Sequence, residues 1–401
     1  MPTAFLVVSI IDLLFTLNAF RPLRVEVLSI FTFFAGWLTS ELPLHHLAWQ
    51  AVATVAFIAA GALDSWQGWV ALAVSVVSWA GLVVLARQSL GAGAVVDRAL
   101  GIDSPGVPTP RQWRRLALPF AMRAKGVDVV KDIPYVEGAG RRQQLDVYRP
   151  AAGVQHAPVL VYIHGGGWVL GDKREQGLPM MWHLAANGWV CVTVNYRLSP
   201  KVAFPEHLLD CKRAMAWVKD HIGEYGGDPA QVAVSGGSAG GHLAALVALT
   251  AGRADLQPGF EDADLSVRAA VPFYGVYDFT NRDGVRGPGF RRFLDKTVMK
   301  TTPAVDPDLY ALASPMDQIN EAAPAFLVIH GANDSLVPVQ EARTFARLLG
   351  ERSSQPVYYA ELPGAQHAFE VFRSIRAAEV VPRVESFLRS ALGLVVDGRG
   401  G

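Results

Sequence analysis

Apolar residues are concentrated at the start of the chain. Residues 1–90 contain no lysine, and only a few charged side chains separate long apolar stretches. A membrane-spanning helix needs about 20 mainly apolar residues, and these stretches are apolar nearly all round instead of striped on one face. We therefore expect residues 1–90 to form a membrane-spanning helical region, with the membrane contacted between residues 4 and 86. The apolar runs are Ala4–Phe20, Val27–Thr39, Leu47–Leu63 and Trp66–Ala86.

The four runs are not equally long. Trp66–Ala86 is long enough to span a bilayer, whereas the first and third runs are at the short end of the range. Val27–Thr39 is too short on its own, and is either a span that includes Leu23–Val25 or an interfacial helix. The alternative to a membrane region is a set of buried core helices. An aromatic belt favours the membrane, because tryptophans lie near the run ends: Trp37, Trp49, Trp66 and Trp69.

Charges within and beside this region leave two questions open. Asp12 lies inside the first run, where a carboxylate is either functional or a polar contact between helices. We favour the polar contact. The orientation in the membrane is not decided by flanking cations, because Arg21 and Arg24 balance Arg87 and Arg98.

A mixed segment follows at residues 91–127. It contains glycines and prolines and then a basic, aromatic-containing piece at Arg111–Lys125, in which Trp113 and Phe120 alternate with arginines. This pattern indicates a linker with an amphipathic helix at the membrane surface. The segment can also serve as a cap over an active site.

Beyond this segment, short β-branched runs alternate with helical patterns. Alternation over about 265 residues is typical of an α/β fold with a mostly parallel sheet flanked by helices. We assign residues 128–393 to this domain and residues 394–401 to a disordered tail; Val276–Ala323 interrupts the rhythm. The expected strands are Val129–Tyr135, Gln144–Tyr148, Pro158–Ile163, Val190–Val194, Val232–Val234, Val267–Phe273, Phe326–Ile329 and Val357–Leu362.

A candidate nucleophile follows the fifth of these strands. Gly236-Gly237-Ser238-Ala239-Gly240 fits the pattern G-x-S-x-G and leads into an alanine-rich helical stretch. In a nucleophile elbow the serine occupies a sharp strand-to-helix turn, and small neighbours relieve the crowding of the backbone. By itself the motif is equally consistent with a glycine-rich turn.

A candidate oxyanion loop follows the third strand. His164-Gly165-Gly166-Gly167-Trp168 begins directly after Pro158–Ile163, and a strand ending in HGGG is the lipase and esterase motif for binding an oxyanion. A phosphate loop is disfavoured because no Lys-Ser/Thr pair follows. His164 itself is expected to be a structural anchor.

The last two strands each precede a candidate catalytic side chain. Asp334 follows Phe326–Ile329, and His367 follows Val357–Leu362. Active sites of open α/β sheets lie at the carboxyl ends of the strands. The chain order Ser238, Asp334, His367 is the order of the α/β-hydrolases and differs from those of chymotrypsin and subtilisin. His330 and His242 are expected to be structural.

Composition narrows the class of protein without adding a site. The formal net charge is zero, so nothing indicates a nucleic-acid partner. Cys191 and Cys211 lack metal-ligand spacing and are expected to be small buried side chains. No metal and no organic cofactor is expected.

The chain resembles α/β-hydrolase serine esterases of the hormone-sensitive-lipase-like group, close to the carboxylesterase and feruloyl-esterase-like branch. The resemblance implies that Gly165, Gly166 and the amide of Ala239 form an oxyanion hole. Gly237 and Lys201 depart from the sequence pattern of this group, since many members carry an acidic residue at both positions. Residues 1–90 are not part of the shared core. The resemblance is carried by His164–Trp168, Gly171-Asp172, Asn195–Pro200, Phe204-Pro205, Asp210, Gly236–Gly241, Asp334 and His367.

These observations predict a membrane-anchored serine carboxylesterase or lipase that acts on a small, lipophilic ester. The alternatives are an amidase or formamidase with the same triad, and a catalytically silent hydrolase fold that serves as an interaction module. The natural substrate, the acyl-chain length and the oligomeric state are left open. We expect a protein starting near Val127 to be soluble and active.

Overall fold

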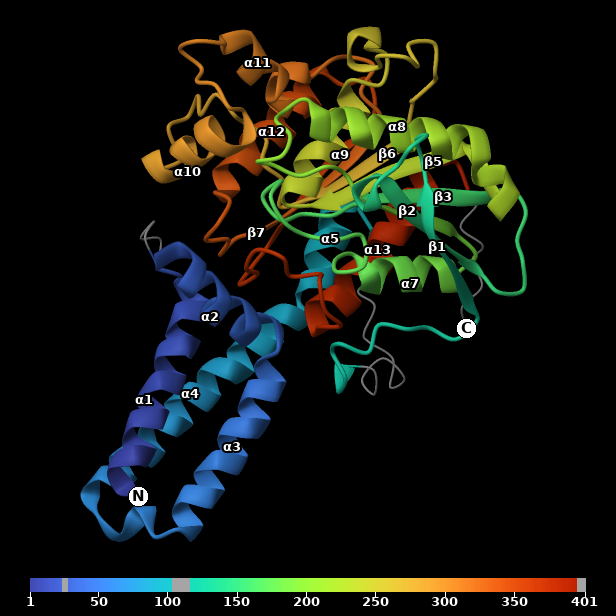
Figure 1. The fold of residues 1–401 in the computed structure, drawn as a ribbon. Coiled ribbons are helices and arrows are strands. Elements are labelled where there is room, and N and C mark those ends of the chain that lie inside the picture. Colours follow the sequence, from blue (N-terminus) through green and yellow to red (C-terminus); the bar gives the residue numbers. More distant parts are fainter. Residues whose placement is uncertain (24–27, 103–115, 395–401) are drawn as a thin grey trace.

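The computed structural model describes residues 1–23, 28–102 and 116–394 of the 401-residue chain. Arg24, Arg111, Trp113 and the tail beyond residue 394, on which some sequence predictions fall, lie outside the described residues. Within them the chain forms a long helical bundle joined to a larger α/β body (Figure 1).

The α/β body is built on one eight-stranded sheet with the order β1-β2-β4-β3-β5-β6-β7-β8. β1, β2 and β4 pair antiparallel, and every pairing from β4 to β8 is parallel. All eight strands predicted from the sequence are present, with ends that differ by a few residues. They are β1 (Val127–Pro134), β2 (Gln144–Pro150), β3 (Ala157–Ile163), β4 (Val190–Val194), β5 (Gly227–Gly237), β6 (Ala269–Phe273), β7 (Ala325–Gly331) and β8 (Val357–Leu362).

Helices cover both faces of this sheet (Figure 1). One face packs against α8 (Glu206–His221), α9 (Ala239–Leu249) and α12 (Val339–Arg352). The other packs against α5 (Ala92–Leu100), α7 (Leu178–Ala186) and α13 (Ile375–Ala391). The central strands are buried on both faces, which explains their continuous apolar runs. This is the α/β-hydrolase fold expected from the sequence.

The excursion at Val276–Ala323 contains two short α-helices, α10 (Pro288–Phe293) and α11 (Pro307–Leu312). It lies beside α12 at the edge of the body (Figure 1). Cys191 and Cys211 are unpaired and buried, as predicted.

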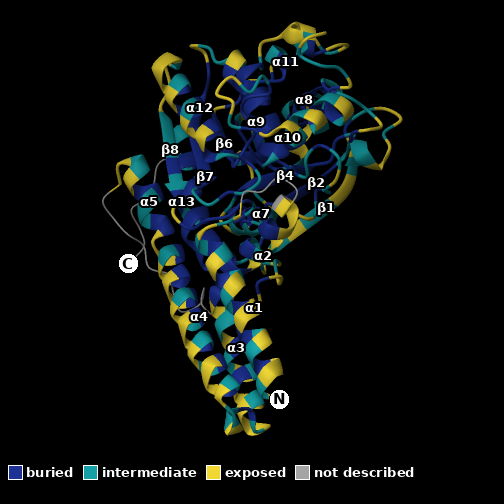
Figure 2. Cartoon of the chain, turned by 90° about the vertical axis from the view of Figure 1, so that its left-hand side faces the viewer, coloured by how far each residue is buried: buried dark blue, intermediate teal, exposed yellow. Residues whose placement is uncertain are grey.

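The N-terminal region contains α1 (Pro2–Phe20), α2 (Ser29–Glu41), α3 (Pro43–Ala59) and α4 (Trp66–Leu90). α1, α3 and α4 run side by side, and α2 lies at the end of the bundle next to the α/β body (Figure 1). The sides of the bundle carry many exposed residues, whereas the body has a buried interior (Figure 2). The exposed side chains of the bundle are largely apolar, including Val52, Val55 and Val77.

Two helices among the described residues are long and apolar enough to cross a membrane, Pro2–Phe20 and Trp66–Leu100. A third candidate is the pair Ile30–Glu41 and Pro43–Ala59, which is bent by 91° at the break. The second apolar run of the sequence is therefore a separate helix turned away from the third run.

Polar side chains inside the bundle bond to each other across helices. The Thr16 hydroxyl is 2.9 Å from the Ser78 hydroxyl, and Ser78 donates to Gln50 on α3. Asp12 is buried in the same bundle and accepts a bond from Thr16 through its backbone carbonyl. Buried hydroxyls satisfied in this way join the three helices without charge.

Part of the segment predicted to be a linker belongs to the α/β body. α5 follows α4 almost directly, and its Ala92 and Val96 are fully buried against the sheet. Arg383 of α13 forms an ion pair with Asp97 of α5 at 2.8 Å. The polypeptide thus passes from the bundle into the sheet packing without a flexible joint at this point.

Candidate active site

Ser238 occupies a strained turn between β5 and α9. Its backbone has φ +58° and ψ −121°, a region that residues other than glycine rarely adopt. The glycines on either side permit the turn, since a Cβ on Gly236 would lie 2.4 Å from the carbonyl oxygen of Gly240. A Cβ on Gly240 would lie 2.0 Å from the carbonyl oxygen of Ile163. Ser238 is partly exposed, whereas the residues on both sides of it are buried.

Asp334 and His367 are joined by a short hydrogen bond. The two residues follow the neighbouring parallel strands β7 and β8, and His367 Nδ1 lies 2.6 Å from Asp334 Oδ2. The other carboxylate oxygen accepts the backbone amides of Leu336 and Val337 at 2.9 and 2.8 Å. The sequence placed both residues at strand ends, and the sheet order brings them into contact.

The environment of Asp334 favours its ionised form. Burial alone would raise the pKa of the Asp334 carboxyl, but His367 and the hydrogen bonds from His330 and His367 hold it well below its usual value. His330 Nε2 lies 3.2 Å from the same carboxylate oxygen and 3.1 Å from the Val337 carbonyl. An anion fixed in this way can orient a histidine ring and stabilise its cation.

Tyr274 connects the serine turn with the histidine. Its ring centroid is 4.5 Å from that of His367, and a Cβ on Gly237 would lie 2.7 Å from its hydroxyl. The glycine that departs from the family pattern thus makes room for this tyrosine. Within the described residues, no hydrogen bond joins the Ser238 hydroxyl to His367; such bonds often tighten only when substrate binds.

A buried carboxylate that the sequence did not indicate lies beneath this tyrosine. Tyr274 donates to one oxygen of Glu370, and Tyr162 donates to the other at 2.9 Å. Burial raises the pKa of the Glu370 carboxyl, and the two tyrosine hydroxyls partly offset the rise. The only signal in the sequence is its position three residues after His367, which does not distinguish it from other loop acids.

The glycine-rich loop after β3 lies against the serine turn. A Cβ on Gly165 would be 3.0 Å from the Cβ of Ser238. The Gly165 amide donates to Gln176 Oε1 at 2.8 Å, so it is already engaged. Gly166 and Gly167 have φ of +115° and +59°. Within the described part of the chain, the amides of Gly166, Gly167 and Ala239 have no acceptor.

His164 lies under this loop. Its ring stacks on Tyr196 with centroids 4.5 Å apart, and Tyr196 donates to the His164 carbonyl at 3.0 Å. Burial lowers the pKa of His164 to about 4, which keeps the ring neutral near pH 7. His242 is likewise buried, with Nε2 2.7 Å from the Ala313 carbonyl. Both histidines therefore bond to the protein backbone and not to the serine.

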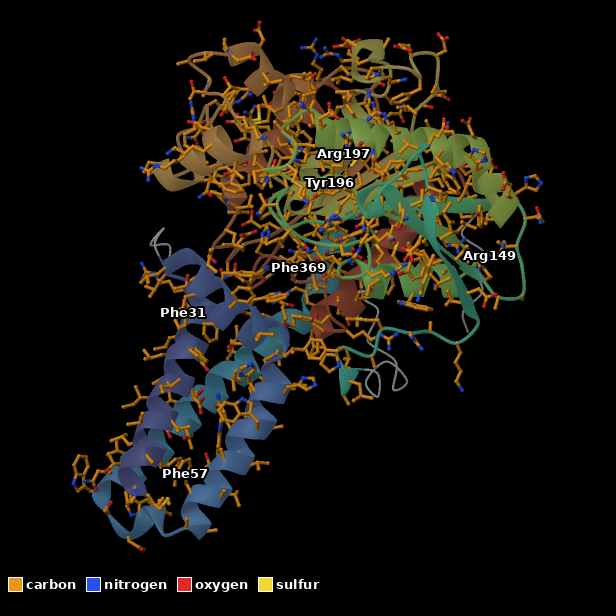
Figure 3. The ribbon with its side chains drawn as sticks, viewed as in Figure 1. Phe31, Phe57, Arg149, Tyr196, Arg197 and Phe369 are labelled. Carbon is orange, nitrogen blue, oxygen red and sulfur yellow. The ribbon has the colours of Figure 1, made fainter. Side chains whose placement is uncertain are left out.

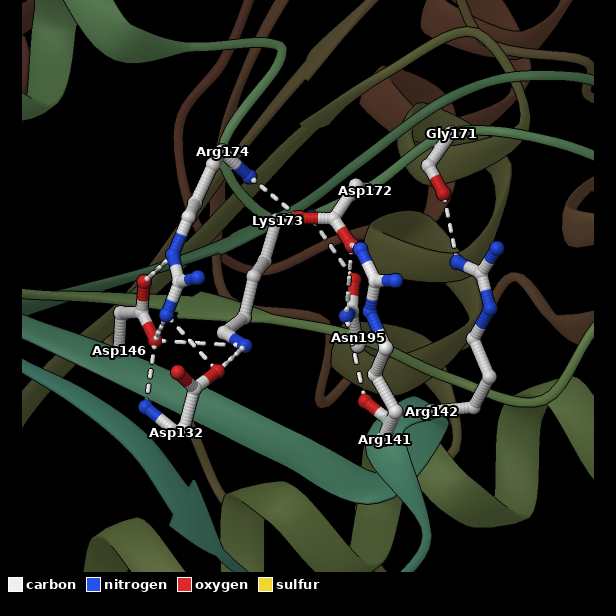
Figure 4. Close-up of polar contacts among 9 residues, drawn as sticks. All are labelled: Asp132, Arg141, Arg142, Asp146, Gly171, Asp172, Lys173, Arg174 and Asn195. Atoms are coloured by element: carbon white, nitrogen blue, oxygen red, sulfur yellow. Dashed lines mark hydrogen bonds and ion pairs between the residues drawn. The ribbon is translucent and has the colours of Figure 1, made fainter.

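A polar network fixes the chain just after the loop (Figure 4). Arg142 donates to the Gly171 carbonyl at 2.6 Å, and Asn195 bonds both Asp172 and the Lys173 amide. Arg174 forms a two-point ion pair with the fully buried Asp146 of β2. These contacts explain why the family pattern includes Gly171-Asp172 and Asn195: they tie the loop to the sheet.

The N-terminal helices contact the loops that carry His367 and Asp334. Trp37 of α2 donates through Nε1 to the carbonyl of Ala368 at 2.8 Å, and the Phe33 ring lies 6.0 Å from the His367 ring. Asn333, the residue before Asp334, donates to the carbonyls of Ala19 and Phe20 at the end of α1, both at 3.0 Å. No pattern in the sequence indicated these contacts.

A buried ion pair strengthens the same junction. Arg376 at the start of α13 pairs with Glu41 at the end of α2, and both side chains are fully buried. The Ser374 hydroxyl lies 3.4 Å from the same carboxylate. Breaking a pair of this kind is costly because it leaves a buried charge without its partner.

The described part of the predicted cap also lies near this junction. Phe120 contacts Phe372 with ring centroids 5.4 Å apart, and Arg373 donates its amide to the Pro119 carbonyl at 3.0 Å. The remainder of the amphipathic piece, including Arg114 and Arg115, falls outside the described residues. The N-terminal helix that contacts the His367 loop is α2, which the sequence assigned to the membrane region alone.

Comparisons with known proteins agree with this architecture. Residues 145–349 match the family model BD-FAE. A probable carboxylic ester hydrolase, LipM of Mycobacterium tuberculosis, is 45% identical over 96% of this chain and 92% of its own. Esterase LipQ of the same organism is 37% identical, covering 92% and 86%. Coverage of 96% extends the first similarity into the N-terminal helices.

Solved structures show the same fold. A thermophilic esterase from Thermogutta terrifontis superimposes with a TM-score of 0.57 and 25% identity, covering 71% of this chain and 99% of that one. A truncated carbohydrate esterase from gut microbiota gives a TM-score of 0.59 at 20% identity, covering 68% and 99%. The second similarity supports the fold alone.

Proposed function

We propose that this chain, which belongs to the BD-FAE family of α/β-hydrolase esterases and is a carboxylic ester hydrolase, uses a Ser238–His367–Asp334 triad. We also propose that it works while anchored in a membrane. The observation that carries the proposal is the 2.6 Å bond between His367 and Asp334, beside a serine held in the strained turn of an elbow. In this proposal three side chains from separate strand ends act together.

In this mechanism the Ser238 hydroxyl attacks the ester carbonyl while His367 Nε2 accepts its proton. Asp334 bonds to Nδ1, which fixes the tautomer and stabilises the imidazolium. The histidine then protonates the departing alcohol and leaves an acyl-enzyme. Water, deprotonated by the same histidine, attacks the acyl carbonyl, and the acid is released as the proton returns to Ser238.

For the oxyanion we propose the amides of Gly166, Gly167 and Ala239. The Gly165 amide, which the family resemblance suggested, already donates to Gln176. The other three amides have no acceptor among the described residues, and they come from the loop that touches Ser238 at Gly165 and from the residue after Ser238. Ala239 is also the first residue of α9, where the positive end of the helix dipole favours a developing negative charge.

The membrane part of the proposal is supported by the bundle. Pro2–Phe20 and Trp66–Leu100 have the length and apolar character of spanning helices, and the outer residues of the bundle are largely apolar. A soluble protein would leave this surface in water, which is unfavourable. We propose that residues 1–90 hold the hydrolase at the membrane surface and that its substrate is a lipophilic small-molecule ester.

The test is labelling of full-length protein by a fluorophosphonate probe, with wild type compared with Ser238→Ala and His367→Ala. Labelling of wild type alone supports the triad. Labelling of Ser238→Ala at the wild-type level would exclude Ser238 as the nucleophile. Carbonate extraction of membranes tests the anchor, and release of the intact chain into the soluble fraction would contradict it. A panel of esters and matched amides distinguishes an esterase from an amidase.

A further inference from the structure

α2 has two apolar faces with different surroundings. On one face Phe33 and Trp37 contact the loop of His367. The adjoining, outward part of the helix surface exposes four large apolar side chains by between 37% and 68%: Ile30, Phe31, Phe34 and Leu38. Figure 3 labels Phe31 on α2 and Phe369 in the nearby hydrolase loop. A helix exposing such a stripe beside a protein core needs an apolar environment on its outer side.

The orientation of α2 identifies that environment. α2 is bent by 91° from α3, and α3 runs alongside α1 and α4 (Figure 1). If those helices cross a bilayer, α2 lies in the plane of its surface, as interfacial helices do. Its exposed stripe is continuous along the chain with the apolar bundle and carries no charge. The occupant of this face is therefore the acyl region of the bilayer.

Aromatic rings connect the exposed side of α2 with the histidine. The His367 ring is 6.0 Å from Phe33, and Phe33 is 5.0 Å from Phe34, which is half exposed. Phe33 itself is buried. The rings thus form a contiguous aromatic cluster from the outer side of the helix to the histidine, and residues 29–40 of α2 carry no charge.

We propose that the substrate is a neutral, long-chain carboxylic ester dissolved in the bilayer, and that its acyl chain reaches Ser238 along Phe33 and Phe34 of α2. This inference rests on the proposed serine mechanism. It assigns Phe33 and Phe34 to substrate binding, and Ile30 and Phe31 to the contact with the bilayer from which the ester enters. An acyl chain that moves from the bilayer to the site along apolar side chains does not have to enter water. Because each methylene group adds to the cost of transfer to water, this route favours longer acyl chains.

The test uses full-length protein reconstituted into phosphatidylcholine vesicles. Two substrates are compared, p-nitrophenyl butyrate in the aqueous phase and p-nitrophenyl palmitate incorporated in the vesicles. The variants are Phe33→Ala and the double variant Ile30→Ser with Phe31→Ser. The matched control is Val305→Ser, which changes an equally exposed apolar side chain, 77% accessible, in the hydrolase.

We expect the double variant to lower kcat/KM for the palmitate ester about tenfold and to leave butyrate hydrolysis unchanged. Phe33→Ala should lower the ratio of palmitate to butyrate activity by a similar factor, and Phe33→Leu should restore it in part. Val305→Ser should leave both activities unchanged. Any other pattern in the double variant, including an equal fall on both substrates or no change in either, overturns the proposal.

The serine mechanism is tested independently of the role of α2. Wild-type hydrolysis of butyrate and its loss in Ser238→Ala test the proposed function whatever α2 does. Circular dichroism and probe labelling of each variant exclude misfolding. Should Phe33→Ala fail to fold, the Ile30 and Phe31 double variant still decides the question, because both side chains are exposed.

Discussion

The two sides of the candidate site are held in different ways. Ser238 and the glycine loop lie between β3, β5 and α9, and every contact described above for them comes from the hydrolase body. Asp334 and His367 lie on loops after β7 and β8 that also contact α1 and α2. The nucleophile is thus held by the hydrolase body alone. The loops of the acid and the base are held in part by α1 and α2, which lie outside that body.

This difference bears on how far the N-terminal region can be separated from the hydrolase. The sequence suggested that a protein starting near Val127 would be soluble and active. In the structure such a protein lacks α5, whose Val96 is buried against the sheet, and the helices that contact the acid and base loops. We now expect a cost in both stability and turnover.

The largest expected effect is on the nucleophile side. Ser238→Ala should lower ester turnover by about 10⁶-fold, because no other group in the site can form the acyl-enzyme. Initial rates with p-nitrophenyl butyrate measure this. A folded Ser238→Ala protein that keeps substantial turnover would contradict the serine mechanism.

Asp334→Asn should cost roughly 10³–10⁴ in turnover, because an amide neither fixes the tautomer of His367 nor stabilises its cation. The matched control is Asp308→Asn at an exposed position in α11, which should leave the rate unchanged. Asp278, Asp308 and Asp317 of the Val276–Ala323 excursion are the rival candidates for the acid. If Asp334→Asn were nearly silent while Asn at Asp278 or Asp317 abolished turnover, the acid would be assigned wrongly.

Asn333→Ala tests whether the contact between the Asp334 loop and α1 matters for catalysis. Loss of its two bonds to the end of α1 should lower kcat by about tenfold, since small misplacement of catalytic groups has effects of this order or larger. The comparison is Asn320→Ala, which removes a similar bond to the carbonyl of Leu249 at the end of α9. Equal losses in the two variants would show that the two sides do not differ.

Trp37→Phe removes a single hydrogen bond to the Ala368 carbonyl and keeps an aromatic ring in place. We expect a fall in kcat of a few-fold with KM unchanged, because one neutral hydrogen bond contributes about 1 kcal/mol. A change confined to KM would assign Trp37 to substrate binding instead.

The smallest effect is expected within the bundle, away from the junction. Asp12→Asn should leave ester turnover within about twofold, because Asp12 lies within α1, away from the loops that carry the candidate acid and base. The carboxylate is buried between helices and contacts neither the acid nor the base loop. A large loss would give Asp12 the functional role that we did not favour.

The sequence determined those features that depend on neighbouring residues. Alternating apolar runs predicted all eight strands, and the glycines around Ser238 predicted a turn that only small residues permit. The positions of Asp334 and His367 at strand ends placed both at one edge of the sheet. Each of these follows from local patterns that a single stretch of chain carries by itself.

Tertiary structure decided which polar groups are already hydrogen-bonded and which helix contacts the site. Whether the Gly165 amide is free depends on Gln176, eleven residues away, and the pairing of Glu370 with Tyr162 joins residues far apart in sequence. The contact of α2 with the His367 loop spans more than three hundred residues. Apolar periodicity shows that a helix buries a face, but not against which partner, because burial is non-directional and only packing selects the neighbour.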